Sequence, residues 1–277
     1  MTIQNIELND GRSIPQLGFG TFKVPPEHTQ EAVETALELG YRHIDTATVY
    51  GNEHEVGLAI AASGLDRDSL WVTTKLWNDK RGREATRAAL GESLEKLGLD
   101  YVDMYLIHWP AVEEGKLEET WETFGELRQE GLTKTIGVSN FDHNFLPQLA
   151  ETGLMPAVTQ VELHPQFQQR KTQEIAARLN VKIEAWGPLG QNKVDYASTV
   201  IGDIARAHDA SWVQVIIAWH LAEGRIIFPK ATGRDHQQQN FDASRLVLTD
   251  SEIAAIDALD KGEDGRVSAN PVGYHAL

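Results

Sequence analysis

An aspartate and a tyrosine stand five residues apart where a predicted strand ends, and together they could carry acid–base chemistry. Residues 41–45 alternate sides as a strand would, and the chain breaks at Gly51-Asn52 before an expected helix. Asp45 is therefore predicted near the carboxyl end of the strand, and Tyr50 in the loop just beyond it. An acid and a phenol placed together in this way need neighbouring charges to tune their protonation.

Two further ionisable residues, Lys75 and His108, end the third and fourth predicted strands. A phenol ordinarily has a pKa of about 10. A lysine within about 4–6 Å would lower that pKa, and reduction would then fall as the pH rises past it. Asp45 would hold Lys75 charged, and His108 could donate a hydrogen bond to a substrate oxygen. This set suits carbonyl reduction with Tyr50 as general acid, and the hydride requires a nicotinamide cofactor.

The elements that must position these residues alternate regularly along the chain. Strands are predicted at residues 17–21, 41–45, 70–75, 102–108, 133–138, 157–162, 181–186 and 226–228. Helices are predicted at residues 25–39, 53–62, 84–97, 117–130, 142–151, 169–179, 198–208, 211–222 and 250–259. Eight strand–helix units predict an α/β fold, a (β/α)8 TIM barrel with parallel strands joined by helical crossovers.

Both ends of the chain depart from this alternation. Asn9-Asp10-Gly11-Arg12 lies between two short apolar runs, which predicts an N-terminal β-hairpin that caps the barrel. The tail 262–277 is rich in Gly, Pro and polar residues and is expected to be irregular. Because no linker or shift in composition interrupts the chain, residues 1–277 are expected to form a single domain.

An open doubly wound sheet is the alternative fold. It would use Gly18-Phe-Gly20-Thr-Phe-Lys23 as its dinucleotide fingerprint, but Lys23 stands where the last glycine belongs. Two prolines then follow in place of a helix start, so the barrel is favoured.

Composition narrows the classes of function. The formal net charge of −16 argues against a general nucleic-acid or membrane-surface binder. No cysteine is present, which excludes disulfides and thiolate chemistry and disfavours a soft metal site. The N-terminus lacks the features of a signal peptide, and no apolar run approaches about 18 residues. We therefore expect a soluble, monomeric, cytoplasmic protein that acts on a small molecule.

Two alternative functions stay open on these residues. A barrel hydrolase could use Asp45 and Glu162 as a carboxylate pair, but it would leave Lys75, Tyr50 and His108 without roles. A barrel that binds cofactor without turnover is disfavoured, because all four catalytic positions are filled. Neither a Gly-x-Ser-x-Gly motif nor a P-loop is present.

The chain resembles the aldo-keto reductase superfamily over nearly its whole length. The stretches that carry the resemblance are Gly40-Tyr-Arg-His-Ile-Asp-Thr-Ala-Thr-Val-Tyr-Gly-Asn-Glu53, Thr135-Ile-Gly-Val-Ser-Asn-Phe141, Thr73-Thr-Lys-Leu-Trp77 and Ile107-His-Trp-Pro110. Within the family it is most similar to short bacterial 2,5-diketo-D-gluconate reductases. Ile183-Glu-Ala-Trp-Gly-Pro-Leu-Gly190 and Asp264-Gly-Arg-Val-Ser-Ala269 point to that group.

The resemblance implies a role for each residue of the site. Tyr50 would be the proton donor, Lys75 and Asp45 the pair that tunes it, and His108 the group that orients the substrate. An apolar substrate cup would be lined by Phe22, Val49, Trp77, His108 and Trp109. The substrate would be a small aldehyde, ketone or keto-sugar acid. Its identity would depend on the loops after strands 1, 4 and 7 and on the tail 266–277.

The resemblance also implies a long cofactor site. Its residues would be Gly20, Thr21, Ser139, Asn140, Gln160, Trp186, Gly187, Pro188, Leu189, Gly190, Gln191, Lys230, Ala231, Thr232, Arg234, His236, Gln239 and Asn240. Ser139, Asn140 and Gln160 would hold the carboxamide. Trp186 would stack on the nicotinamide, and residues 187–191 would pass over the pyrophosphate.

The segment for the adenosine end departs from the family pattern of Pro-Lys-Ser, an Arg and Glu-Asn. Lys230 and Asn240 are kept, whereas Ala231, His236 and Gln239 replace the usual Ser, Arg and Glu. A 2′-phosphate prefers charged or bidentate donors, of which Arg is the best. NADPH is the expected cofactor, and the lost contacts leave appreciable use of NADH open.

Overall fold

A computed structural model describes residues 3–112 and 115–274 of the 277-residue chain. The barrel strands are β3 (Phe19–Gly20), β4 (His43–Asp45), β5 (Trp71–Leu76), β6 (Val102–Ile107), β7 (Thr133–Ser139), β8 (Val158–Glu162), β9 (Lys182–Trp186) and β10 (Ile226–Ile227). They form one parallel sheet in the order β10-β9-β8-β7-β6-β5-β4-β3, and a bridge between Leu17 and Ile227 joins its two edges. The predicted barrel is confirmed.

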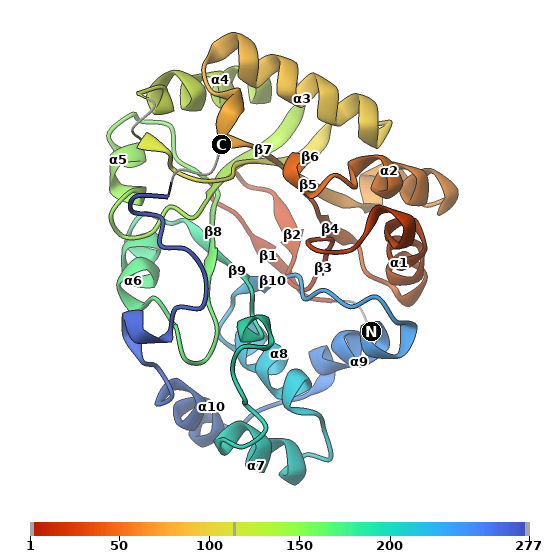
Figure 1. The fold of residues 1–277 in the computed structure, drawn as a ribbon, viewed down its shortest axis with the longest axis vertical. Helices are drawn as coiled ribbons and strands as arrows, with labels where there is room; N and C mark the ends of the chain where they lie inside the picture. The colour runs from red at the N-terminus through yellow and green to blue at the C-terminus, as the bar shows by residue number, and fades with distance from the viewer. Residues whose placement is uncertain (1–2, 113–114, 275–277) are drawn as a thin grey trace.

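Helices surround the barrel on its outside (Figure 1). They are α1 (Pro26–Leu39), α2 (Glu53–Ala62), α3 (Arg83–Leu97), α4 (Leu117–Gln129), α5 (Leu146–Ala150), α6 (Arg170–Arg178), α7 (Val200–Ala207), α8 (Trp212–Ala222), α9 (Arg234–Asp242) and α10 (Asp250–Asp257). Short 3₁₀ turns are η1 (Thr48–Tyr50), η2 (Arg67–Ser69), η3 (Asn78–Lys80), η5 (Gly190–Asn192), η6 (Ala243–Arg245) and η7 (Gly262–Gly265). The connections between successive barrel strands therefore run along the outer surface.

Local chemistry explains where several helices begin and end. Gly40 ends α1 because its φ of 106° reverses the chain, and its N–H donates back to the last turn. Ser211 begins α8 with a capping box to Gln214, and Thr249 begins α10 with the same motif to Glu252. These signals lie within a few residues, so the sequence marks these ends clearly.

Helix α9 was missed by the sequence prediction, and α5 is shorter than expected. The α9 sequence contains Phe241 but otherwise only polar and charged residues, so it lacks an apolar period. Tertiary hydrogen bonds replace that signal: Gln237 donates to the carbonyls of Ala32 and Ala231 and accepts from the Tyr41 hydroxyl. Residues 143–145 form turns and delay the start of α5 to Leu146.

The predicted hairpin closes the end of the barrel where the strands begin. Its strands β1 (Asn5–Glu7) and β2 (Ser13–Pro15) pair antiparallel. Ile14 is fully buried in an apolar cluster whose other buried members are Leu8, Trp71, Met104, Leu106, Ala157, Val158 and Ile226. The Asn9 amide donates to the carbonyls of Pro156 and Asn180, just before β8 and β9. The opposite end of the barrel is therefore the open one.

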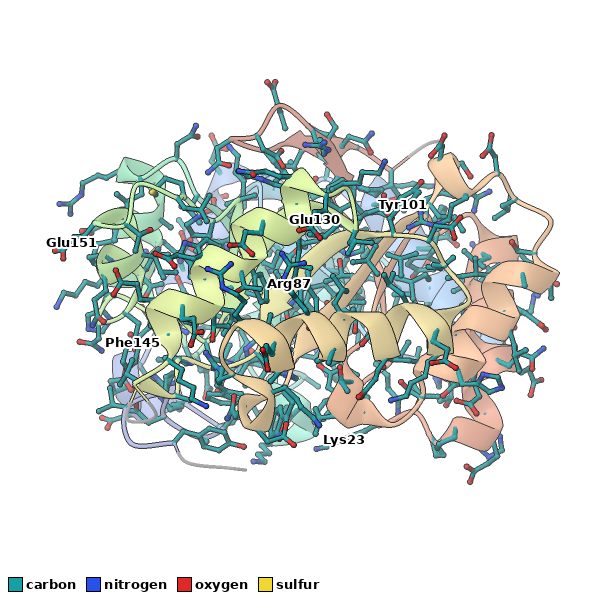
Figure 2. The ribbon with its side chains drawn as sticks, turned by 90° about the horizontal axis from the view of Figure 1, so that it is seen from above. Lys23, Arg87, Tyr101, Glu130, Phe145 and Glu151 are labelled. Carbon is teal, nitrogen blue, oxygen red and sulfur yellow. The ribbon has the colours of Figure 1, made fainter. Side chains whose placement is uncertain are left out.

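The outer helices also contact each other through charged groups. Arg87 on α3 reaches Glu126 and Glu130, at the end of α4, at 2.7 and 2.6 Å, and Figure 2 shows Arg87 and Glu130 across the gap between these helices. Solvent screens such exposed pairs, so they contribute little to stability. None of the helices in residues 3–112 and 115–274 combines the length and apolarity that a bilayer crossing needs.

Candidate active site

The polar residues at the strand ends meet around one cavity at the open end of the barrel. Asp45 ends β4, Ser139 ends β7, Gln160 lies in β8 and Trp186 ends β9. These residues, together with Tyr50 and His108 from the loops, line a cavity of about 630 Å³. Parallel strands bring their carboxyl ends to one face, which is where barrel enzymes place their chemistry.

Lys75 is the centre of the first group of side chains. Its Nζ atom lies 2.6 Å from Asp45 Oδ1, 2.9 Å from the carbonyl oxygen of Thr46 and 3.2 Å from the Tyr50 hydroxyl. The side chain of Lys75 is fully buried. All three ammonium hydrogens thus have a partner, and one of them points at the phenol.

These contacts keep Lys75 charged despite its burial. Burial acts to lower the pKa of Lys75, but Asp45 and Tyr50 outweigh it, and the pKa lies above its ordinary value. A buried charge without such partners would instead lose its proton. Lys75 therefore presents a fixed positive charge to the Tyr50 hydroxyl.

The pKa of Tyr50 differs from the sequence-based expectation. Burial raises the pKa of Tyr50, and Asp45 raises it further, while the charge and hydrogen bond of Lys75 lower it. The effect expected of Lys75 is present, but burial outweighs it, so the pKa is raised and the prediction of a lowered pKa is wrong. Tyr50 consequently keeps its proton across the neutral range.

His108 lies against Tyr50 and Trp77, with ring centroids 5.8 and 5.1 Å apart and the rings edge to face. Burial holds the pKa of His108 well below its ordinary value, and the charges of Lys75 and Arg81 act in the same direction. The imidazole is therefore neutral near pH 7. A neutral ring can donate a hydrogen bond without adding a second positive charge beside Lys75.

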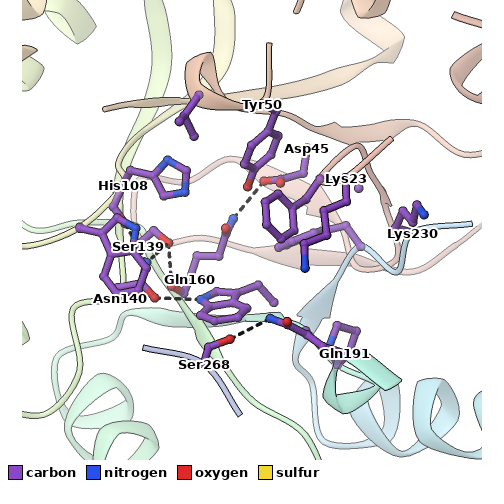
Figure 3. A pocket seen from close by; sticks show the side chains of 18 of the residues that line it. Lys23, Asp45, Tyr50, His108, Ser139, Asn140, Gln160, Gln191, Lys230 and Ser268 are labelled. Carbon is purple, nitrogen blue, oxygen red and sulfur yellow. Dashed lines mark hydrogen bonds between the residues drawn. The ribbon is translucent and has the colours of Figure 1, made fainter. Parts of the chain in front are cut away.

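A second group of polar side chains lies on the other side of the same cavity (Figure 3). Asn140 donates to the His108 carbonyl at 2.8 Å and accepts from Trp186 Nε1 at 3.0 Å. Ser139 donates to the Gln160 carbonyl at 3.0 Å. The Gln160 amide reaches across to Asp45 Oδ2 at 3.0 Å, and it thereby connects the two groups.

The cavity gathers many of the predicted cofactor residues but not all of them. Those that line it are Gly20, Ser139, Asn140, Gln160, Trp186, Gly187, Pro188, Leu189, Gln191 and Lys230. Those outside its lining are Thr21, Gly190, Ala231, Thr232, Arg234, His236, Gln239 and Asn240. Arg234 pairs with Glu38 of α1 at 2.7 Å, and both side chains are more than half exposed.

The predicted substrate residues all line the cavity, namely Phe22, Val49, Trp77, His108 and Trp109. The lining also includes residues that were not predicted individually: Lys23, Phe228, Pro229, Ser268, Ala269 and Tyr274. Lys23 had a signal, since it is a cation three residues after β3. The last three lie in the tail expected to affect substrate choice, whose residues 275–277 lie outside the described part of the chain.

The tail crosses the cavity and is fastened on both sides of it. Gln191 Nε2 donates to Ser268 Oγ at 2.8 Å, as Figure 3 shows, and Lys193 donates to the Val267 carbonyl at 2.6 Å. Tyr274 stacks on Trp109 with ring centroids 3.9 Å apart. The tail thus forms one wall of the cavity.

The carboxylate pair of a hydrolase does not form. Asp45 lines the cavity and is bonded to Lys75 and Gln160. Glu162 is instead bonded to His164 and to the backbone N–H of Val267, and it is absent from the cavity lining in the described part of the chain. Among the described residues, no three His, Asp or Glu side chains gather as metal ligands would.

Comparison with known proteins agrees with this geometry. The model of the "Aldo/keto reductase family" matches residues 16–261. An "Aldo-keto reductase" of Mycobacterium sp. (strain KMS) is 45% identical over 98% of this chain and 97% of its own length. "Methylglyoxal reductase DkgA" of Escherichia coli (strain K12) is 42% identical over 93% of this chain and 94% of its own length.

Solved structures agree as well. The crystal structure of a mutant of Gox0644 in complex with NADPH superposes with a TM-score of 0.94 and 39% identity, covering 100% of both chains. Barrel, strand-end residues and whole-length similarity all coincide, and the chain therefore belongs to the aldo/keto reductase family of oxidoreductases.

Proposed function

We propose that this protein is an NADPH-dependent carbonyl reductase in which Tyr50 donates the proton. The observation that carries the proposal is the position of Lys75, whose ammonium lies between the Asp45 carboxylate and the Tyr50 hydroxyl beside the cavity. Family membership supplies the reaction class, and this geometry supports the roles that we propose for the residues.

The chemistry of the cavity fits a nicotinamide dinucleotide. Ser139, Asn140 and Gln160 provide hydrogen-bonding groups for a carboxamide, next to the flat face of Trp186. Lys23 and Lys230 place positive charge in the lining, as an anionic phosphate requires. The NADPH in the Gox0644 complex supports the same cofactor here. When bound, NADPH supplies the hydride.

The residues of the chain would complete the reduction around that hydride. Tyr50 donates its proton to the carbonyl oxygen as negative charge develops there. The positive charge of Lys75, 3.2 Å from the hydroxyl, stabilises the phenolate that results. The neutral His108 ring donates a hydrogen bond to the same oxygen and sets its direction.

The substrates we propose are small aldehydes, ketones and keto-sugar acids. The aromatic rings of Phe22, Trp77 and Trp109 make the wall near Tyr50 apolar, and the name of the Escherichia coli relative includes methylglyoxal, a small dicarbonyl. We also propose that the protein acts as a monomer.

Replacement of Tyr50 by Phe tests the assignment of the proton donor. We expect kcat for reduction to fall about 10²–10⁴-fold, the usual contribution of a positioned general acid. Binding of NADPH, followed by quenching of tryptophan fluorescence, should change by no more than about twofold. Unchanged turnover in Tyr50→Phe would show that another group is the acid.

The pH profile of reduction gives a second test. Reduction needs protonated Tyr50, and the pKa of Tyr50 is raised above its ordinary value of about 10. The loss of rate caused by ionisation of Tyr50 should therefore begin above about pH 10. The residual activity of Tyr50→Phe gives the control. A decline in kcat between pH 7 and 9 that is absent from Tyr50→Phe would show that Tyr50 ionises at a lower pH than we propose.

A further inference from the structure

The Gln160 amide is held on two sides by carboxyl groups. Its Nε2 atom lies 3.0 Å from Asp45 Oδ2 and 2.9 Å from Glu184 Oε2. Glu184 lies in β9 directly beside Gln160 of β8 in the parallel register, so both side chains face the same side of the sheet. An amide nitrogen carries two hydrogens, and each of them has one acceptor here.

Glu184 has no other hydrogen-bonding role in the described part of the chain. It is fully buried, its Oε1 atom has no partner there, and its one side-chain hydrogen bond is with Gln160. Burial, and the negative charge of Asp45, raise the pKa of Glu184 to about 8. A buried carboxyl group is unfavourable for folding unless it is well partnered, so its presence points to a task at Gln160.

Two hydrogen bonds fix an amide in a way that one cannot. With Asp45 as its single partner, the Gln160 amide could rotate about that bond and carry its oxygen out of line. The second bond to Glu184 fixes the plane of the amide, and Gln160 Oε1 then faces away from both carboxyl groups. Gln160 lines the cavity, and no described residue donates to its Oε1 atom.

We propose that Glu184 is a positioning residue that orients the Gln160 amide, so that its oxygen accepts a hydrogen bond from the carboxamide of the bound nicotinamide. The inference rests on the proposed use of NADPH. Glu184 acts without touching the cofactor, because it does not line the cavity in the described residues.

Two neutral variants of similar size separate this task from simple filling of space. Glu184→Gln keeps an oxygen that can accept from Gln160, whereas Glu184→Met offers only a thioether sulfur, which is a weak acceptor. Each would be titrated by tryptophan fluorescence with NADPH and with 2′-phospho-ADP-ribose, which lacks the nicotinamide. Thermal unfolding checks that each variant is folded, and Glu184→Leu replaces Glu184→Met if the latter is not.

We expect Glu184→Gln to bind NADPH within about twofold of the parent protein. We expect Glu184→Met to bind it about tenfold more weakly, the loss of roughly one hydrogen bond. Binding of 2′-phospho-ADP-ribose should stay unchanged in both. In a Gln160→Met background, Glu184→Met should cause no further loss, because the amide on which Glu184 acts is gone.

Other outcomes would overturn the inference. Equal effects of Gln and Met at position 184 would show that the acceptor is irrelevant. Equal weakening of NADPH and 2′-phospho-ADP-ribose would indicate a general structural role. Failure of the parent protein to bind NADPH would refute the proposed function, and the role of Glu184 would fall with it. Normal binding by the parent protein combined with either of the variant results above would refute the role of Glu184 alone.

Discussion

Charged residues in the barrel interior owe their state to the groups that touch them. Lys75 keeps its proton because Asp45, Thr46 and Tyr50 accept hydrogen bonds from its ammonium group. His108 loses its proton because it is buried near that positive charge. Burial therefore keeps Tyr50 and His108 neutral, while Lys75 stays charged through its contacts with Asp45, Thr46 and Tyr50.

Glu184 should make the stability of the protein depend on pH. The pKa of Glu184 is raised to about 8 in the folded state, against about 4.3 in an unfolded chain. The folded state thus binds this proton more tightly, and stability falls as pH rises from about 4.3 to 8. The full shift corresponds to about 5 kcal/mol.

The Glu184→Gln variant has no ionisable group at this position, so its stability should lack this dependence on pH. Relative to the parent protein, its free energy of unfolding should rise by several kcal/mol between pH 5 and pH 8, measured in urea at each pH. If the substitution changes the free energy of unfolding equally at pH 5 and pH 8, Glu184 must have the same pKa in the folded and unfolded chains.

Which residues meet at the site could be predicted from the sequence, but their protonation could not. Asp45, Lys75 and His108 each stand at the end of a strand, and the ends of parallel strands converge. The direction of the Tyr50 pKa depends on how deeply the phenol is buried, and spacing along the chain does not contain that quantity. Glu184 was invisible for the same reason, because nothing in its spacing shows that Gln160 reaches it.

At the scale of elements, α9 is the part of the site that folds without an apolar pattern. Its position depends on the buried amide of Gln237 and on Phe241, whose ring packs edge to face against Tyr41 just after α1. The predicted adenosine-end residues lie on this helix and in the segment before it. Contacts from distant elements therefore place them, and sequence periodicity could not reveal the helix.

The pairing of α9 with α1 bears on the choice of cofactor. Arg234 is the candidate to replace the missing Arg at a 2′-phosphate, but it is paired with Glu38. We expect Glu38→Gln to release Arg234 and to tighten NADPH binding up to about fivefold, within the range of an exposed ion pair. Binding of NADH, which lacks the phosphate, should not change.

Glu31→Gln is the matched control, since Glu31 is exposed on the same helix and losing it removes the same charge. An equal gain in both variants would show that general electrostatics, and not Arg234, is responsible. Arg234→Ala should abolish the difference between them. Fluorescence titrations with NADPH and NADH give all of these values.

At the scale of the whole molecule, the two ends of the barrel carry different tasks. The hairpin fills the end where strands begin, and the cavity occupies the other. Lys23, which follows β3, and Tyr101, which precedes β6, lie toward opposite ends in Figure 2. The main apolar cluster includes buried residues from Leu17 to Ile256, and a second cluster joins the hairpin to the barrel strands. We propose that residues 1–277 form one domain.

Substitution in the hairpin should separate stability from activity. Ile14 is fully buried, so Ile14→Ala should lower the free energy of unfolding by about 2–5 kcal/mol. The kcat of the folded variant should match the parent, because Ile14 lies at the end away from Tyr50. The exposed Glu7 provides a control, and Glu7→Ala should change stability by no more than about 0.5 kcal/mol. Urea denaturation and initial rates would measure both, and a large loss of kcat in Ile14→Ala would contradict the division of tasks.

The stacking of Tyr274 on Trp109 has a practical side for anyone who attaches this protein to a surface. A purification tag or a resin linker joined to the C-terminal end would begin a few residues from an aromatic wall of the cavity. The same tag joined before the hairpin would leave from the closed end of the barrel. Immobilisation through the N-terminal end should thus leave the cavity facing the medium, with the tail free to keep its contacts.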